Sequence, residues 1–136
     1  MRIAVISVPR QRGGVPQYVK SLAKGMESMG HRVDILDAWT EEGFRLPGYE
    51  YIAVCAESVS FWGGKMPEAL QRILSTGSGL VGKKSAAFYK KTSPIFVNKA
   101  LSNLMKAMEK EGMLINWSEI LFNAPQAEAL GKRIGA

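Results

Sequence analysis

The sequence has few of the residues that build most catalytic and metal centres. Its 136 residues include one cysteine, Cys55, and one histidine, His31. Cys55 therefore has no partner for an internal disulfide, and the chain has neither a Cys-x-x-Cys pair nor a histidine cluster that would bind zinc. A single histidine also excludes most histidine-based catalytic sets. We predict no metal site and identify no catalytic residue, which leaves open whether the protein is an enzyme.

Long apolar runs are missing as well. No stretch reaches the ~18 consecutive apolar residues that a membrane span requires. Met1 leads directly into a strand-like segment rather than into a signal peptide. These features predict a protein without a membrane partner, located in the cytoplasm.

The sequence has no dense basic cluster, although its net charge is +6. Its lysines and arginines are scattered and are not interleaved with aromatic residues. A positive charge can attract nucleic acid or an anionic cofactor, but scattered charge more often keeps a protein soluble. Nucleic acid is therefore not a favoured partner, and the oligomeric state stays open.

Strand and helix patterns alternate regularly along the chain, which predicts one α/β domain over residues 1–136. Near-continuous apolar runs predict buried strands over residues 2–8, 33–36, 51–56 and 85–89, with a fifth inside 114–122. Apolar residues at three- and four-residue spacing predict helices after the first, third, fourth and fifth strands. The last helix is expected to follow Pro125 and to carry Leu130 and Ile134. Residues 39–50 contain turn-forming residues and predict a loop with at most one helical turn.

Strands joined in this way pair in parallel through right-handed crossovers, which place helices on both faces of the sheet. We therefore predict a three-layer αβα sandwich around a five-stranded parallel sheet. Ligands of such sheets bind beyond the carboxyl ends of the strands, where the strand order reverses. We expect a ligand site at the loops that follow the first, third and fourth strands.

Several segments, in this order and spacing, resemble the flavodoxin family over essentially the whole chain. They are residues 14–31 with their Gly-His exit, residues 49–74 with an aromatic, a glycine and a Met-Pro pair before a helix, residues 82–84 before an Ala-rich strand, and residues 128–133. The resemblance implies the strand order 2-1-3-4-5, a bound FMN, and electron transfer by that flavin to a redox protein partner.

The first loop departs from the family pattern. Flavodoxins have a Ser/Thr-x-Thr-Gly-x-Thr turn that holds the FMN phosphate, whereas residues 11–16 here read QRGGVP. The hydroxyls are absent, and Pro16 has no backbone N–H. Gly13 and Gly14 would let the backbone approach an anion, and Arg10 and Arg12 could bind phosphate oxygens in place of the hydroxyls. Alternatively, the two glycines form a tight turn and both arginines point into water.

The loop after the third strand carries the strongest aromatic signal. Phe61 and Trp62 could stack on the flat flavin ring, and Gly63 and Gly64 would open the backbone to its edge. Alternatively, an aromatic side chain folds over the following helix or docks against another protein.

Polar residues flank this loop on both sides. Glu57 and Ser58 directly follow the third strand, where they could contact a ligand. Lys90, Lys91 and Thr92 follow the fourth strand, and a positive charge there would stabilise the anionic reduced ring. The lysines could equally form a solvated surface.

Three functions remain open from the sequence. The first is an FMN-binding protein that carries electrons, which needs no acid–base residues. The second is an NAD(P)H-dependent FMN reductase, because Ser7 and Arg10 faintly match the Gly-Ser-x-Arg loop of those enzymes. The third is a flavin-free module of the same fold, which the missing hydroxyls favour.

If Trp62 stacks on the flavin, the Trp62→Ala variant should bind FMN more weakly by about 1–3 kcal/mol, as for the loss of aromatic–base stacking. Quenching of FMN fluorescence measures this affinity. An unchanged affinity would show that the ring lies against another wall.

Overall fold

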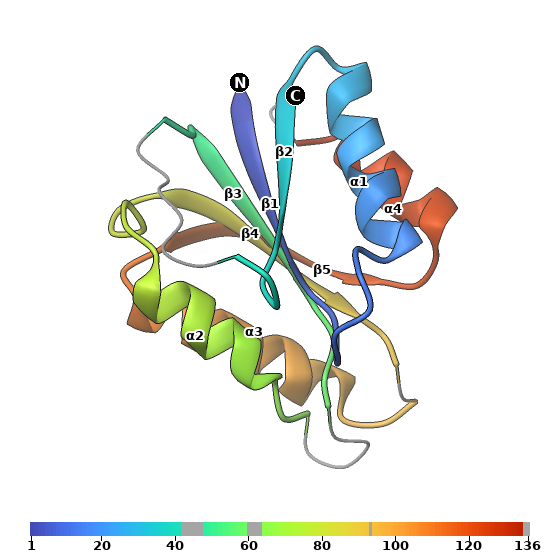
Figure 1. Ribbon diagram of the computed structural model, residues 1–136. Coiled ribbons are helices and arrows are strands. Elements are labelled where there is room, and N and C mark those ends of the chain that lie inside the picture. The colour runs from blue at the N-terminus through green and yellow to red at the C-terminus, as the bar shows by residue number, and fades with distance from the viewer. Residues whose placement is uncertain (42–47, 60–63, 93, 135–136) are drawn as a thin grey trace.

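The computed structural model describes residues 1–41, 48–59, 64–92 and 94–134. Strands and helices alternate along the chain (Figure 1). The strands are β1 (Arg2–Val8), β2 (Arg32–Asp37), β3 (Tyr51–Ala56), β4 (Lys84–Lys90) and β5 (Leu114–Leu121), and the helices are α1 (Gln17–Ser28), α2 (Glu68–Thr76), α3 (Val97–Lys110) and α4 (Ala124–Gly131). No helix within the described ranges is long and apolar enough to cross a bilayer.

The strands form one five-stranded sheet in the order β2-β1-β3-β4-β5, and each neighbouring pair is parallel. The central strand β3 is buried along its whole length, whereas the edge strands β2 and β5 are mostly half-exposed. This difference follows from the layers, because only the central strands are covered on both faces. The predicted fold class and strand order are confirmed.

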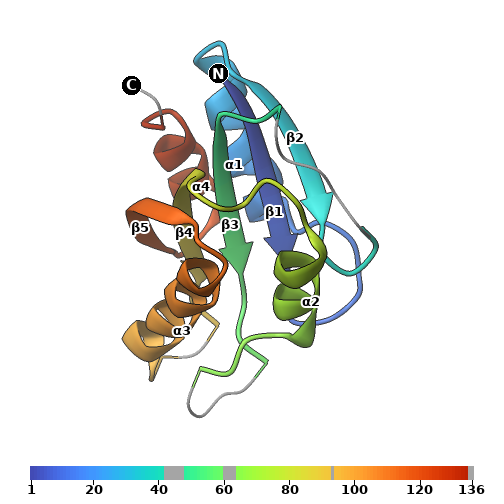
Figure 2. The same cartoon turned by 90° about the vertical axis from the view of Figure 1, so that its left-hand side faces the viewer.

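Two helices cover each face of the sheet (Figure 2). Alternate residues of β1 divide between the two cores, because successive strand side chains point to opposite faces. Ile3 and Val5 pack with α1 and α4, whereas Ala4 and Ile6 pack with α2 and α3. The apolar run in β1 therefore supplies both cores, which explains why its sequence shows no alternation.

Helices α1 and α4 cross where each has a glycine. A Cβ on Gly25 would collide with the backbone carbonyl of Glu128, and a Cβ on Gly131 would collide with that of Leu22. Neither glycine has a positive φ angle. They are required here because the two backbones touch, not because the chain turns.

The end of α4 differs from the prediction. Asn123 caps the helix by accepting a hydrogen bond from the backbone N–H of Gln126 at 2.9 Å, so the helix begins before Pro125. It ends at Gly131, and Ile134 lies in the turn beyond it. Ile134 is nevertheless buried in the α1–α4 core, so its apolar character reflected packing rather than helical periodicity.

The Gly25→Ala variant should lower the free energy of unfolding by about 1–3 kcal/mol, because its methyl group forces α1 and α4 apart. Helix propensity alone predicts the opposite sign, a gain of about 1 kcal/mol. Chemical denaturation measures the difference. Gly13→Ala is the control, since no atom lies within 4 Å of a Cβ there, and it should change stability by less than about 0.5 kcal/mol. A stabilised Gly25→Ala variant would contradict the close contact.

Candidate functional site

The loops after β1, β3 and β4 lie at one edge of the sheet, at the carboxyl ends of the strands (Figure 1). Glu57 links two of them. Its backbone N–H donates to the carbonyl of Val8 at 3.0 Å. Its carboxylate accepts one hydrogen bond from the backbone N–H of Arg10 at 3.1 Å and another from the hydroxyl of Tyr18 at 2.8 Å. The carboxylate therefore lies between the loop after β1 and the first turn of α1.

Tyr18 is a buried residue of that first turn. Burial raises the pKa of its hydroxyl, and the neighbouring Glu57 carboxylate raises it further. The Tyr18 hydroxyl thus stays protonated and donates a hydrogen bond to Glu57. The ammonium nitrogen of Lys90 lies 5.6 Å from the centre of the Tyr18 ring, which brings the end of β4 to the same cluster.

Three hydroxyl groups join the ends of β3 and β4. The Oγ of Ser58 lies 3.1 Å from the hydroxyl of Tyr89 and 3.4 Å from the Oγ1 of Thr92, and the latter two are 3.4 Å apart. Ser58 and Tyr89 are buried, whereas Thr92 is exposed. The structure therefore brings the predicted residues Ser58 and Thr92 together, through a tyrosine that the sequence indicated only as part of a strand.

The loop after β1 is open around its glycines. Gly13 and Gly14 are exposed, and Gly14 has a φ angle of +85°, which favours glycine. The side chain of Arg10 is exposed. The N-cap of α1 is Pro16, which makes no side-chain capping hydrogen bond. The amides of the first helical turn thus lack the capping side chain that most helices have.

Arg12 is held by Trp39, a residue that the sequence analysis did not assign to the site. The guanidinium donates to the carbonyl of Trp39 at 2.9 Å and lies 5.6 Å from the centre of its ring. The indole N–H of Trp39 donates in turn to the carbonyl of Pro9 at 2.8 Å. Its position directly after β2, the neighbour of β1, was the signal that could have identified it.

Gly64 has a structural requirement of its own. Its φ angle is +66°, and a Cβ would lie 2.8 Å from the backbone nitrogen of Ala100 in α3. The side-chain amide of Asn103 donates to the carbonyl of Gly64 at 3.2 Å. The glycine thus lets the loop pack against α3. Phe61, Trp62 and Gly63 lie outside the described residues, so their roles stay predictions.

The remaining predicted residues lie on either side of this cluster. Lys91 is exposed, and its ammonium nitrogen lies 5.6 Å from the centre of the Phe122 ring. Ser7 is fully buried in β1, and its hydroxyl has no hydrogen-bond partner among the described residues. Cys55 is also fully buried, and burial raises the pKa of its thiol, so it packs as an apolar side chain.

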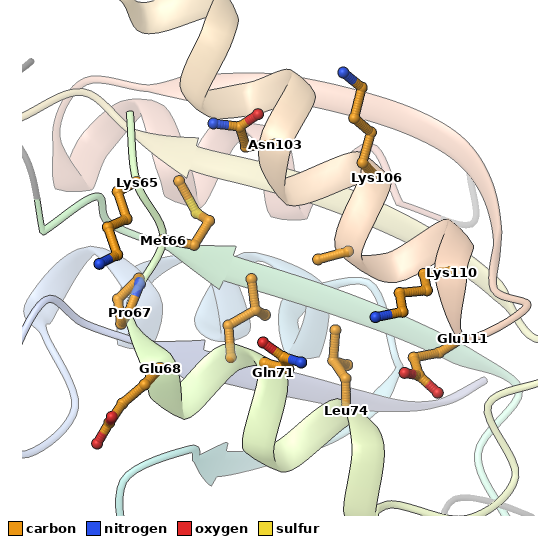
Figure 3. A pocket seen from close by; sticks show the side chains of 12 residues that line it. Lys65, Met66, Pro67, Glu68, Gln71, Leu74, Asn103, Lys106, Lys110 and Glu111 are labelled. Carbon is orange, nitrogen blue, oxygen red and sulfur yellow. The ribbon is translucent and has the colours of Figure 1, made fainter. Parts of the chain in front are cut away.

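A pocket of about 590 Å³ lies between α2 and α3, and the end of the loop after β3, at Lys65, Met66 and Pro67, also lines it (Figure 3). Its apolar lining includes Leu70, Leu74 and Ala107, and Lys110 extends over it from α3 toward α2. None of the predicted site residues lines it. Among the residues that the structure describes, no group of three or more His, Cys, Asp or Glu side chains could hold a metal ion.

Solved structures with the same architecture are flavodoxins and related proteins. Oxidised flavodoxin 1 from Bacillus cereus has 15% sequence identity and a TM-score of 0.70, over 96% of this chain and 95% of that one. A flavodoxin from the domain Archaea has 18% identity and a TM-score of 0.64, over 99% and 94%. A flavone reductase has 10% identity and a TM-score of 0.70, over 98% of this chain and 62% of that one.

No protein-family model matches the sequence, and no curated protein matches it. The likeness to the solved structures nevertheless shows that the chain has a flavodoxin-like fold, as the sequence resemblance implied. At these identities the likeness shows the fold alone.

The Tyr18→Phe variant should lower the free energy of unfolding by about 1.5–3 kcal/mol at pH 7, because the Glu57 carboxylate loses a donor. Above about pH 10 this difference should narrow by about 1.4 kcal/mol per pH unit. An unfolded tyrosine ionises there, whereas folded Tyr18 stays protonated because burial raises its pKa. Unfolding of the unmodified chain then releases a proton and becomes easier, a loss of stability that the variant does not share. Denaturation at several pH values measures both effects.

Tyr51→Phe is the matched control. The Tyr51 hydroxyl donates to the neutral side chain of Asn116 at the other end of the sheet, and burial raises its pKa to about 12. At pH 7 the Tyr51→Phe variant should have a free energy of unfolding lower by about 0.5–1.5 kcal/mol. A loss at position 18 no larger than that at position 51 would contradict a charge-assisted bond to Glu57.

Proposed function

We propose that this chain is a flavin-binding protein that takes part in electron transfer, with FMN as the flavin that the family resemblance implies. The observation that carries the proposal is the meeting of three loops at the carboxyl edge of a flavodoxin-like sheet. Parallel sheets of this kind bind ligands at that edge. The neighbours named flavodoxin support the proposal through their common fold.

The ring end of a flavin fits the described residues. The hydroxyls of Ser58, Tyr89 and Thr92 can each donate or accept a hydrogen bond, which suits the nitrogen and oxygen atoms along the edge of the ring. Thr92 is exposed and is the member of the cluster that a ligand can reach. A bound flavin would supply reversible uptake of electrons, and Lys90 and Lys91 would favour the negative charge that its ring gains.

The phosphate end fits less well. The backbone N–H of Arg10 donates to Glu57, and the guanidinium of Arg12 donates to Trp39. Each residue therefore has one N–H group engaged within the protein, the backbone amide of Arg10 and one of the five guanidinium N–H groups of Arg12. The described residues at the ring end therefore support the proposal more than those at the phosphate end do.

Two alternatives remain candidates. The absence of hydroxyl side chains between Pro9 and Pro16 favours a module of this fold that binds no flavin. The likeness to the flavone reductase supports a reductase, although this chain covers only 62% of that protein. A redox partner protein for the electron carrier, and a cytoplasmic location, are part of the proposal.

The purified protein should quench flavin fluorescence on titration and should show the visible absorption bands of a bound flavin. The Thr92→Val variant should bind the flavin about 3–10-fold more weakly, which corresponds to the loss of one hydrogen bond. Fluorescence titration measures both affinities.

The control is Thr76→Val, since Thr76 bonds to Arg72 at the end of α2, and it should bind as tightly as the unmodified chain. A protein that quenches no flavin would be the flavin-free module. Rapid bleaching of the bound flavin by NADPH, with no partner protein added, would indicate the reductase.

A further inference from the structure

We propose that the Glu57 carboxylate occupies the anion-binding position of this edge, so that the site takes a flavin ring without recognising a phosphate group. The inference rests on the proposed function, the binding of a flavin, but it departs from the FMN that the family resemblance implies. The preferred ligands are flavins without a phosphate, of which riboflavin is the simplest to test.

The hydrogen bonds of Glu57 locate the carboxylate. Arg10 is the second residue after β1, and Tyr18 is the second residue of α1. A strand–loop–helix unit holds a phosphate between these two elements, because the loop amides and the amino end of the helix both attract an anion. Here one oxygen of Glu57 accepts a hydrogen bond from the backbone N–H of Arg10 in the loop at 3.1 Å, and the other accepts one from the side-chain hydroxyl of Tyr18, on the first turn of the helix, at 2.8 Å. The protein's own anion thus takes the place of an external one.

The carboxylate is fixed in this place. The backbone of Glu57 is tied to β1 by its hydrogen bond to Val8. Tyr18 is only 7% exposed, so its hydroxyl has little freedom to turn toward another acceptor. Both anchors belong to the folded core, and an arriving phosphate would have to displace a carboxylate that is held by two donors.

The negative charge of Glu57 opposes phosphate as well, against the one ammonium group that the described residues bring to this cluster, Lys90, 5.6 Å from the centre of the Tyr18 ring. A phosphate monoester carries up to two negative charges near neutral pH, and like charges at close range in a partly buried site repel strongly. The loop has no hydroxyl side chain between Pro9 and Pro16 to provide neutral donors instead. The guanidinium of Arg12 is directed to Trp39. A ligand without a phosphate avoids this repulsion.

The test compares FMN and riboflavin, which have the same ring and differ in the phosphate. Fluorescence titration gives the dissociation constant of each for the unmodified chain and for Glu57→Gln, which keeps the shape of the side chain and removes its charge. The unmodified chain should bind riboflavin at least as tightly as FMN. The variant should bind FMN about tenfold more tightly than the unmodified chain does, with riboflavin changed less than about twofold, because only the phosphate meets the missing charge.

Glu27→Gln is the control, because it makes the same change of net charge on an exposed residue at the far end of α1. It should leave the preference between the two flavins unchanged. FMN binding restricted to the Glu57→Gln variant would also support the inference. If Glu57→Gln does not fold, the unmodified chain alone decides the matter.

Two results would overturn the inference while leaving the proposed function intact. One is binding of FMN by the unmodified chain at least tenfold tighter than riboflavin. The other is an equal gain for both flavins in Glu57→Gln, which would mean that the carboxylate faces the ring. Binding of neither flavin by either protein would overturn the proposed function together with the inference.

Discussion

The carboxylate of Glu57 is the group on which the arrangement of this edge depends. A half-buried carboxylate is costly unless strong donors satisfy it. It has two, the backbone N–H of Arg10 and the hydroxyl of Tyr18. Since these donors belong to the loop after β1 and to α1, one acidic side chain at the end of β3 fixes both elements against the sheet. The edge where this fold binds ligands is therefore organised around an anion that the protein supplies itself.

The position of α1 that this bond requires is set by packing elsewhere along the buried face of the helix. Gly25 and Gly131 allow the backbones of α1 and α4 to touch, and Val19, Leu22 and Met26 pack the same helix onto the sheet. Tyr18 is buried with these α1 residues, next to Val19 and about one turn before Leu22. The helix crossing and the site are thus parts of one rigid arrangement, although they lie at different places along α1.

A second tie holds the loop after β1 from the side of β2. Trp39 accepts a hydrogen bond from Arg12 and donates one to Pro9, so it bridges the beginning and the middle of the loop. This bridge engages one of the five N–H groups of the guanidinium that the motif suggested as a phosphate ligand. It also explains how a loop without hydroxyl side chains keeps a defined shape around two exposed glycines.

Much of the fold could be predicted because strands that are covered on both faces have near-continuous apolar runs in the sequence. The runs that became β1, β3 and β4 are apolar at nearly every position, and no surface helix has that pattern. The end of α4 was predicted wrongly because Ile134 packs in the core from the turn beyond the helix. In the sequence, an apolar residue at that spacing has the same appearance whether it lies in the helix or in the turn after it. Gly64 shows a similar ambiguity, because the sequence does not tell a glycine that borders a ligand from a glycine that packs against α3. Only the close approach of the Gly64 backbone to that of Ala100 distinguishes the two.

The sequence by itself determined the order of the elements, the parallel sheet and the edge at which its loops meet, because these follow from apolar patterns and from the handedness of crossovers. Only the tertiary structure decided which groups at that edge are free to bind. Arg12 and Glu57 are both charged residues in loops, and nothing in their neighbours along the chain tells that one is bound to Trp39 and the other to Tyr18. Those partners are 27 and 39 residues away, and hydrogen bonds of that kind arise only when the packed strands bring the loops together.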